Sequence, residues 1–412
     1  MFDQYLARRY RTEVRPSPEA YLIKDRTAVV GVANTEFSKN SGRTTVQMAC
    51  EVIKGVVEDA GMKIEDIDGL VRFTGDATDE DTLINALGIP DLNFFGQCPM
   101  GGSGGTNIVM HAALAVATGV AKYVVAYRSM NEYSGARIGR RGEALGAEKG
   151  PKTVRFMKDS YGAPYGFISP VSWVATFARR YMHVYSATRE HLAWVSINNR
   201  EHAQTNPNAM FYGRPITMKD YFEAPMVVEP FCRLDCCLDS DGAVALLVTT
   251  AERARDLKQR PAYILAAVQG TATDGEMMTS HHRPRIERLP ESWYTGEELW
   301  RVSGVTPKDI DVCQLYDAFS ILPIAQLEEY GFCGEGEGPD FCWERERIKV
   351  GGELPINTSG GLMSEAYIHG VNLVAEAVRQ IRGTSLNQVK DAELSMVTAG
   401  LGVPTGAIIF RR

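Results

Sequence analysis

Tyr316 and its neighbour Asp317 lie where an α/β protein can build a catalytic site. Tyr316 ends an apolar run, residues 312–316, and a helix is predicted to begin at Phe319. Open α/β sheets assemble their sites at the carboxyl ends of strands, so both side chains are candidates. A phenol can exchange a proton with a substrate. Asp317 could tune Tyr316 or accept hydrogen bonds from backbone N–H groups at a helix start.

A second turn, residues 360–370, carries Tyr367 and His369 together with Gly361 before another predicted helix. A free tyrosine has a pKa of about 10, so Tyr367 would need positive or hydrogen-bonding neighbours to act as a base, but none to act as a neutral donor. His369 could orient a tyrosine or cap the helix that follows. If both turns face one cleft, the tyrosines form a pair that moves protons. The alternative is two buried structural tyrosines.

The glycine-rich turn at residues 101–105 opens a helix predicted over 106–118. Backbone N–H groups at such a turn can polarise a carbonyl oxygen. Cys98 should lie on the strand side of the turn, away from the helix N-terminus that would lower the pKa of a thiol. Ser103 lies in the turn, but the sequence shows no histidine beside it to activate it. We therefore expect no covalent catalysis by Cys98 or Ser103.

Composition argues against several other classes of function. The 412 residues carry a net charge of −7, which does not favour a nucleic-acid partner. No apolar run approaches the roughly 20 residues that a membrane span needs. The amino terminus has no hydrophobic stretch typical of a signal peptide, so we expect a cytoplasmic protein with reduced thiols.

The sequence shows no motif for a metal or a nucleotide cofactor. The eight cysteines fit no zinc spacing, because adjacent Cys236 and Cys237 cannot easily face one metal, and the pair His281–His282 has no second cluster to support it. The glycines at 96 and 101 have P-loop spacing without the lysine that grips phosphate. No dinucleotide fingerprint follows the first predicted strand. We therefore expect no metal and no required cofactor.

The chain contains an internal repeat. Gly, Asp, Ile and Asp recur at one spacing in residues 61–68 and 304–311, an offset of 243 residues (304 minus 61). A predicted helix precedes each copy, at 45–60 and 296–303, and an apolar strand follows each copy. A period of this length indicates a duplicated domain, and the alternation of helices with apolar strands indicates α/β layers.

The repeat suggests how the chain is divided. We place an amino-terminal extension at residues 1–24, the first half at 25–255 and the second half at 256–412. The first half holds an insertion, about 130–230, rich in aromatic, glycine and proline residues, which predicts loops that shape a substrate site or an interface. We expect the extension to lie as an arm on a neighbouring surface.

Several separated motifs agree, in order, with one known family. After residue 25 the chain resembles the thiolase superfamily. The motifs at 37–43, 180–183, 315–317 and 365–370 are similar to those of its lipid-transfer-protein branch, and more narrowly of the steroid side-chain-cleaving aldolases in that branch. The resemblance implies a duplicated α/β fold with α-β-α-β-α layers and a loop-rich insertion in the first half.

The resemblance also implies a changed site on a retained scaffold. A thiolase has a nucleophilic cysteine, a histidine and a second cysteine at places that correspond here to Gly102, Tyr367 and Gly400. Its asparagine–glutamate corner corresponds to the pair Tyr316-Asp317. Gly102 and Gly400 would leave room for a bulky substrate carbon, and Gly361 is a further supporting candidate.

Such aldolases cleave a β-hydroxyacyl-CoA whose hydroxyl sits on a tertiary steroid carbon. A tertiary alcohol cannot be oxidised to a ketone, so thiolysis has no substrate, whereas retro-aldol cleavage gives a 17-ketosteroid and propionyl-CoA. The resemblance implies that Tyr316 and Tyr367 move the protons: one takes the proton of the hydroxyl, and the other stabilises or protonates the enolate. CoA enters as part of the substrate, and basic or aromatic residues of the insertion are candidates to hold it.

Two other functions stay open on the sequence alone. One is a non-catalytic lipid-transfer protein that binds acyl-CoA or sterol in a retained pocket. The other is a residual thiolase that uses Cys98. The resemblance further implies a homodimer joined through the first halves, and a partner with an OB-fold domain of the domain-of-unknown-function-35 type, together a heterotetramer.

Overall fold

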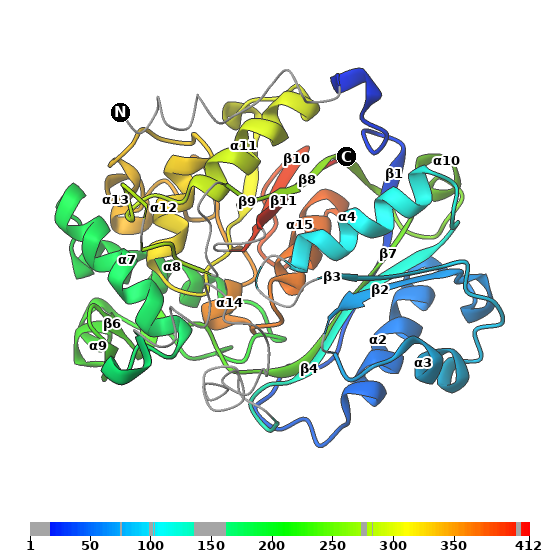
Figure 1. Cartoon of the computed structure of the whole chain (residues 1–412), viewed down its shortest axis with the longest axis horizontal. Coiled ribbons are helices and arrows are strands. Elements are labelled where there is room, and N and C mark those ends of the chain that lie inside the picture. Colours follow the sequence, from blue (N-terminus) through cyan, green and yellow to red (C-terminus); the bar gives the residue numbers. More distant parts are fainter. Residues whose placement is uncertain are drawn as a thin grey trace.

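The chain builds one nine-stranded mixed sheet covered by helices (Figure 1). The computed structural model describes residues 17–74, 76–98, 102, 104–135, 162–272, 278–281, 283–400 and 405–412. Within these ranges no helix is long and apolar enough to cross a bilayer.

The strand order in the sheet is β3-β2-β4-β7-β1-β8-β11-β10-β9. In each half the outer strands run parallel (β3, β2 and β4; β9 and β10), and the inner strands pair antiparallel. The antiparallel pair of β1 and β8 joins the halves. The strands are β1 (Thr27–Asn34), β2 (Gly69–Phe73), β3 (Phe94–Cys98), β4 (Val124–Asn131), β7 (Asp241–Thr250), β8 (Ala262–Gly270), β9 (Val312–Gln314), β10 (Leu394–Ala399) and β11 (Thr405–Arg411), while β5 (Met226–Val228) and β6 (Phe231–Cys232) form a separate ribbon.

The helices divide into a central layer and two outer layers. α4 and α15 contact strands of both halves, whereas α2 packs on β1, β7 and β4, and α11 packs on β8 and β11. Each half of the nine-stranded sheet therefore forms one layer, and α4 and α15 lie between the two halves. The order is helix, sheet, helix, sheet, helix, which confirms the predicted layers. The helices are α2 (Thr45–Ala60), α3 (Glu80–Leu87), α4 (Gly104–Ala117), α7 (Pro170–Tyr185), α8 (Arg189–Ala203), α9 (Met218–Glu223), α10 (Ala251–Ala254), α11 (Pro290–Ser303), α12 (Ile321–Glu329), α13 (Gly338–Phe341), α14 (Gly361–Ser364) and α15 (Val371–Arg382).

Two hydrophobic cores follow from these layers. Successive residues of a strand point to opposite faces of the sheet, so Leu70 of β2 joins the core under α2, while Val71 and Phe73 join the core around α4 and α15. Helices therefore cover both faces of the sheet in the first half, as its near-continuous apolar strands require.

Equivalent elements recur at the predicted offset of 243 residues. The 3-10 turns η3 (Ile64–Asp66) and η7 (Pro307–Asp309) correspond, and each follows a helix that ends on a left-handed glycine, Gly61 (φ 73°) or Gly304 (φ 77°). An L side chain is strained at these angles, which explains the glycine in both copies. The predicted duplication is confirmed, whereas the boundaries near 25 and 255 stay predictions.

The second repeated aspartate has the same structural role in both halves. The Asp68 carboxylate accepts hydrogen bonds from the backbone N–H groups of Lys122 and Tyr123 (2.8–3.0 Å), directly before β4. The Asp311 carboxylate accepts them from Glu393 and Leu394 (both 2.8 Å), at the start of β10. Each aspartate therefore fixes the beginning of the parallel strand beside its own.

The described part of the insertion is mainly helical, so the expectation of loops was wrong for residues 162–230. α7, α8 and α9 cover most of it, and α8 reaches the second half. The Asn199 amide donates to Asp317 (2.6 Å) and the Arg200 guanidinium donates to Ser364 (3.2 Å). Insertion helices thus support the turns that carry the candidate site.

The described end of the amino-terminal extension lies against the second half. The backbone N–H of Ala267, on β8, donates to the Tyr21 hydroxyl (2.8 Å), and the Lys24 ammonium donates to the carbonyl of Ser303 at the end of α11 (2.7 Å). Residues 1–16, with the arginines of the predicted arm, lie outside the described residues.

We expect Asp68→Ala and Asp311→Ala each to lower the free energy of unfolding by about 1–3 kcal/mol, because the N–H groups at a strand start lose their acceptor. Urea denaturation of each variant measures this. Asp91→Ala, which removes an exposed carboxylate, is the control and should change the value by less than about 0.5 kcal/mol. Equal values for all three variants would contradict the role of the repeated aspartates.

Candidate active site

The Tyr316 and Tyr367 hydroxyls lie 2.9 Å apart, within hydrogen-bond distance, and either can be the donor. Tyr316 is 2% exposed, just beyond the carboxyl end of β9, and Tyr367 is half-buried. Burial raises the pKa of Tyr316 well above its ordinary value of 10. Burial, and then repulsion from Tyr316, raises the pKa of Tyr367 in the same direction. Both phenols are therefore neutral near pH 7.

Two buried polar side chains fix the backbone of Tyr316. Its N–H donates to the Thr398 hydroxyl (2.9 Å), and its carbonyl accepts from the Gln326 amide (2.8 Å). The Thr398 hydroxyl donates in turn to the Gln326 carbonyl oxygen (2.6 Å), which closes a ring of hydrogen bonds. Because an unsatisfied buried group is costly, this ring resists displacement of the Tyr316 phenol.

Gly102 is the place where the phenol of Tyr316 enters the site. A Cβ at residue 102 would fall closer to the Tyr316 hydroxyl and ring than real Cβ atoms ever lie to a neighbour. The expectation that Gly102 leaves room for substrate is therefore wrong: the vacated space holds Tyr316. Gly104 and Gly105 are restricted in the same way, by the Phe73 ring and by the backbone of residues 369–370.

Asp317 binds a helix start, but a different helix from the one expected. Its carboxylate accepts from the N–H groups of Leu362 (2.9 and 3.0 Å) and Met363 (3.3 Å) in α14. The helix predicted from Phe319 begins at Ile321 instead, and Phe319 forms a β-bridge. Burial raises the pKa of Asp317 to about 7, although its N–H donors act in the opposite direction.

Gly361 is required by the contact that Asp317 makes. The residue has φ of 63°, in the left-handed region that favours glycine, and a Cβ there would overlap the Asp317 carboxylate. Gly361 therefore supports the site through α14.

Of the two roles expected for His369, capping of the following helix is wrong. Gly370 is the N-cap residue, and the Nδ1 atom of His369 accepts a hydrogen bond from Nε of Arg128 on β4 (3.2 Å). The guanidinium of Arg128 also forms an ion pair with Asp76, in the turn after β2. The His369 ring lies 4.9 Å from the Tyr367 ring, centroid to centroid.

The sequence reasoning missed several residues that surround the tyrosine pair. Glu132, buried directly after β4, disfavours negative charge on both phenols, and the thiol of Cys237, which burial keeps neutral, belongs to the same surroundings. The Ser240 hydroxyl accepts from the backbone N–H of Tyr367 (3.0 Å). A polar residue at the end of a strand was an available signal for Glu132, whereas nothing local singles out Cys237 or Ser240.

Cys98 ends β3 on the strand side of the turn, as predicted, and is fully buried. Its Sγ lies 3.3 Å from Nδ1 of His111, and burial raises the pKa of its thiol to about 12. A neutral thiol is a poor nucleophile, so this environment does not favour a thiolase role. Gly400 has φ of 94°, which favours glycine, and its part in admitting substrate stays a prediction.

Two remaining candidates fall partly outside the described residues. Ser103 and His282 are among the undescribed ones. His281 lies 2.7 Å from the Thr176 hydroxyl, through Nε2, and packs edge-on against Phe167. The described part of the chain contains no group of three side chains that could hold a metal ion.

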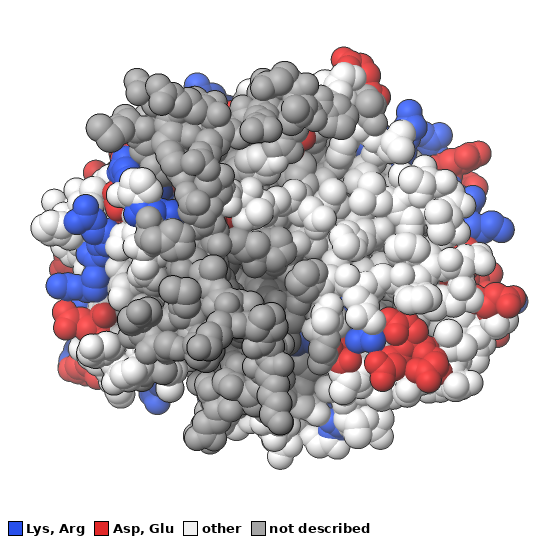
Figure 2. All heavy atoms as spheres, viewed as in Figure 1, with Lys and Arg blue, Asp and Glu red and all other residues white. Residues whose placement is uncertain are grey.

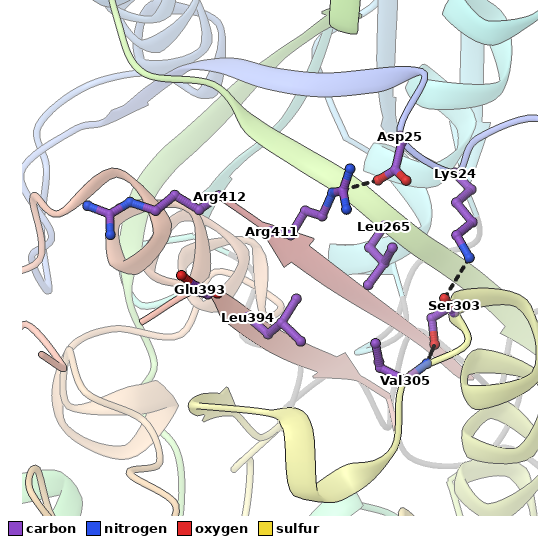
Figure 3. A pocket seen from close by; sticks show the side chains of 9 residues that line it. All are labelled: Lys24, Asp25, Leu265, Ser303, Val305, Glu393, Leu394, Arg411 and Arg412. Atoms are coloured by element: carbon purple, nitrogen blue, oxygen red, sulfur yellow. Dashed lines mark hydrogen bonds and ion pairs between the residues drawn. The ribbon is translucent and has the colours of Figure 1, made fainter. Parts of the chain in front are cut away.

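A cleft of about 540 Å³ lies at the opposite end of β10 and β11 from the tyrosines (Figure 3). Within it, Arg411 pairs with Asp25 (2.8 Å) and the Lys24 ammonium donates to the carbonyl of Ser303 (2.7 Å). This cleft is therefore separate from the tyrosine site. It is lined by Lys24, Asp25, Leu265, Ser303, Val305, Glu393, Leu394, Arg411 and Arg412.

Comparisons with known proteins agree with this geometry. A family described as "Thiolase C-terminal domain-like" matches residues 270–410. The chain is 48% identical over 389 residues to the 17-hydroxy-3-oxo-4-pregnene-20-carboxyl-CoA lyase of Mycobacterium tuberculosis, covering 94% of this chain and 100% of that protein. It is 47% identical over 389 residues to a steroid side-chain-cleaving aldolase of Thermomonospora curvata, covering 94% and 98%. The solved Ltp2-ChsH2(DUF35) aldolase superimposes with a TM-score of 0.89 at 45% identity, covering 95% and 98%.

The layered duplicated fold and these matches define a protein of the thiolase class. The chain belongs to the thiolase superfamily, among its steroid side-chain-cleaving aldolases. It is an enzyme of the carbon–carbon lyase class.

We expect Gly102→Ala to lower the lyase rate by about 100-fold or more, because the new methyl displaces the Tyr316 phenol and a shift of about 1 Å in a reacting group has that cost. Steady-state kinetics measure the loss. Gly96→Ala, on β3, is the matched control: its Cβ meets the Phe94 ring at an ordinary 3.4 Å, and activity should be retained. Full activity in Gly102→Ala would contradict the close approach.

Proposed function

We propose that the chain catalyses retro-aldol cleavage of a β-hydroxyacyl-CoA whose hydroxyl sits on a tertiary steroid carbon. The substrate is a 17-hydroxy steroid with a three-carbon CoA side chain, and the products are a 17-ketosteroid and propionyl-CoA. The observation that carries the proposal is the hydrogen-bonded hydroxyl pair of Tyr316 and Tyr367, at the carboxyl end of β9 in a chain of this family. Relatives named for lyase action on such a CoA thioester support the substrate class.

In the proposed reaction, the bond breaks between the ring carbon that bears the hydroxyl and the α-carbon of the thioester. The bonding electron pair passes to the α-carbon as an enolate, and the alcohol becomes a ketone. The hydroxyl proton moves to one tyrosine oxygen, that tyrosine passes its own proton to the other, and the second tyrosine protonates the α-carbon. Both phenols end neutral, and either order of Tyr316 and Tyr367 satisfies the balance.

The raised pKa values of the two phenols favour such a concerted shuttle over a free phenolate. A buried phenolate beside Glu132 would be unfavourable, whereas two neutral hydroxyls can each accept one proton while donating another. The burial that prevents ionisation therefore leaves both phenols neutral and able to take part in coupled transfer.

The proposed cleavage is redox-neutral, so it requires no redox cofactor, and CoA enters as part of the substrate. We assign the CoA phosphates to basic residues of the insertion. Figure 2 shows Lys and Arg side chains along the side of the molecule where α7 lies, and α7 carries the exposed Arg179 and Arg180. Both guanidiniums face carboxylates at 3.3 and 3.5 Å, contacts that are weak enough to exchange for phosphate.

The assembly proposed for this chain is a homodimer that also binds an OB-fold partner of the domain-of-unknown-function-35 type. β3 supports the dimer, because it is an edge strand of the first half and its Phe95 is 65% exposed. The partner is proposed from the solved Ltp2-ChsH2(DUF35) aldolase, to which this chain is similar. Two copies of each chain would give a heterotetramer.

We expect Tyr316→Phe and Tyr367→Phe each to lower turnover by about 10²–10⁴-fold, the usual contribution of one positioned proton-transfer group. The chain, co-expressed with its OB-fold partner, is incubated with the 17-hydroxy steroid CoA thioester. Mass spectrometry then quantifies propionyl-CoA and the 17-ketosteroid.

Tyr127→Phe is the matched control for both substitutions. Tyr127 is fully buried in the other core, and its hydroxyl donates to the Thr78 carbonyl (3.1 Å). Its loss should affect stability and leave turnover within about 2-fold, since it lies outside the proton path. Tight binding of intact substrate by the wild type without any product would overturn the lyase proposal in favour of a carrier.

We expect Phe95→Asp to dissociate the dimer, because a charge cannot be buried unpaired where two β3 edges meet. Light scattering after size exclusion gives the mass. Phe222→Asp, at a 45% exposed site on α9, is the control and should leave the mass unchanged. A dimer that survives Phe95→Asp would place the interface elsewhere.

A further inference from the structure

His369 is tied to the first half of the chain by a buried ion pair. Asp76 and Arg128 are each 5% exposed and His369 is 2% exposed. The Nε–H of Arg128 donates to Nδ1 of His369 at 3.2 Å, while the same guanidinium pairs with Asp76. A nitrogen that accepts a hydrogen bond carries no proton, so the ring proton of neutral His369 lies on Nε2. The guanidinium therefore selects one tautomer of the imidazole.

The backbone of His369 is held in an unfavourable conformation. Its φ is 50°, in the left-handed region, which is unfavourable for a residue other than glycine. Its carbonyl lies against the first turn of α4, where a Cβ at Gly105 would be only 2.8 Å away. Such strain persists only where surrounding contacts enforce it, and here those contacts come from both halves.

The His369 ring lies between the ion pair and the tyrosine pair. Its centroid is 4.9 Å from that of Tyr367 and 5.6 Å from that of Phe73. The Arg128 guanidinium stacks over the same Phe73 ring at 4.8 Å. Rotation of the imidazole would thus break the hydrogen bond to Arg128 and move the surface against which Tyr367 packs.

We propose that Asp76, Arg128 and His369 form a positioning relay that holds the Tyr367 hydroxyl against Tyr316. Asp76 fixes the guanidinium, the guanidinium fixes the tautomer and orientation of the imidazole, and the imidazole fixes the Tyr367 ring. The effect on turnover rests on the proposed function. The effect on the ring of Tyr367 does not.

Three substitutions separate the parts of the positioning relay. Arg128→Lys keeps a charge for Asp76 and loses the Nε–H donor to His369. His369→Asn keeps an acceptor for Arg128 and tolerates a positive φ, but removes the ring. His369→Phe keeps a ring beside Tyr367 and removes the acceptor. We expect kcat to fall about 10–100-fold in all three with KM within about 3-fold, because the chemical step depends on the hydroxyl geometry.

Two NMR signals test the positioning relay without substrate, in the full complex. The ring nitrogens of His369 are observed in protein labelled with ¹⁵N-histidine, and the Cζ of Tyr367 in protein labelled with ¹³C-tyrosine. His369→Asn and Tyr367→Phe assign the two signals. We expect the Nε2–H tautomer in the wild type, its loss in Arg128→Lys, and a displaced Tyr367 Cζ signal in Arg128→Lys, His369→Asn and His369→Phe.

A double-mutant cycle distinguishes positioning from general support of the fold. His369→Asn should lower kcat in the wild type but cost less than about 3-fold in the Tyr367→Phe background. An equal loss in both backgrounds, or an Nδ1–H tautomer in the wild type, would overturn the positioning relay. If the wild type forms no product but the Tyr367 signal still moves, the proposed function fails and the positioning relay stands. If the wild type forms product but none of the three substitutions changes the Tyr367 signal or kcat, the positioning relay fails and the proposed function stands.

Discussion

The Tyr316 side chain, just beyond the carboxyl end of β9, approaches the turn before α4 so closely that residue 102 has no room for a side chain. Tyr316 occupies the volume that any Cβ at residue 102 would need. A cysteine at 102 and a phenol at 316 therefore exclude one another. The predicted replacement of the thiolase nucleophile by Gly102 and the presence of Tyr316 are thus sterically coupled, and the rest of the site is arranged around this contact.

Buried polar groups make this close approach rigid. Beyond the hydrogen-bond ring at Tyr316, the side chain of Asn357 bonds both the N–H and the carbonyl of Leu315 (2.7 and 2.9 Å), as a neighbouring strand would. The Gln314 and Thr358 side chains bond each other beside it (3.0 Å). Each group is satisfied only in this arrangement, so the segment after β9 has one conformation available at low cost.

Much of the architecture could be predicted because its signals are local. The helix at 45–60 has its predicted ends, and the Gly61 and Gly304 repeat marks a left-handed helix end in both halves. The alternation of helices with apolar strands indicated α/β layers, and the resemblance to the thiolase superfamily implied their α-β-α-β-α order. Both tyrosines could be selected as candidates because each ends or follows such an element.

The contacts between distant segments could not be predicted. Arg128 meets His369 across 241 residues, and Asp317 reaches a helix 45 residues later rather than the adjacent one. No periodicity or spacing encodes which partner a buried charge will find. For the same reason, the glycine at 102 indicated that volume had been vacated, but not that the chain itself fills it.

The offset of the repeat also relates two rings at the site. Tyr316 lies 243 residues after Phe73 (316 minus 73), so the two are equivalent positions of the duplicated halves. Both rings press on the same helix start, Phe73 at Gly104 and Tyr316 at Gly102. At this pair of positions the two copies differ by one oxygen atom, so only the second copy places a hydroxyl at the start of α4.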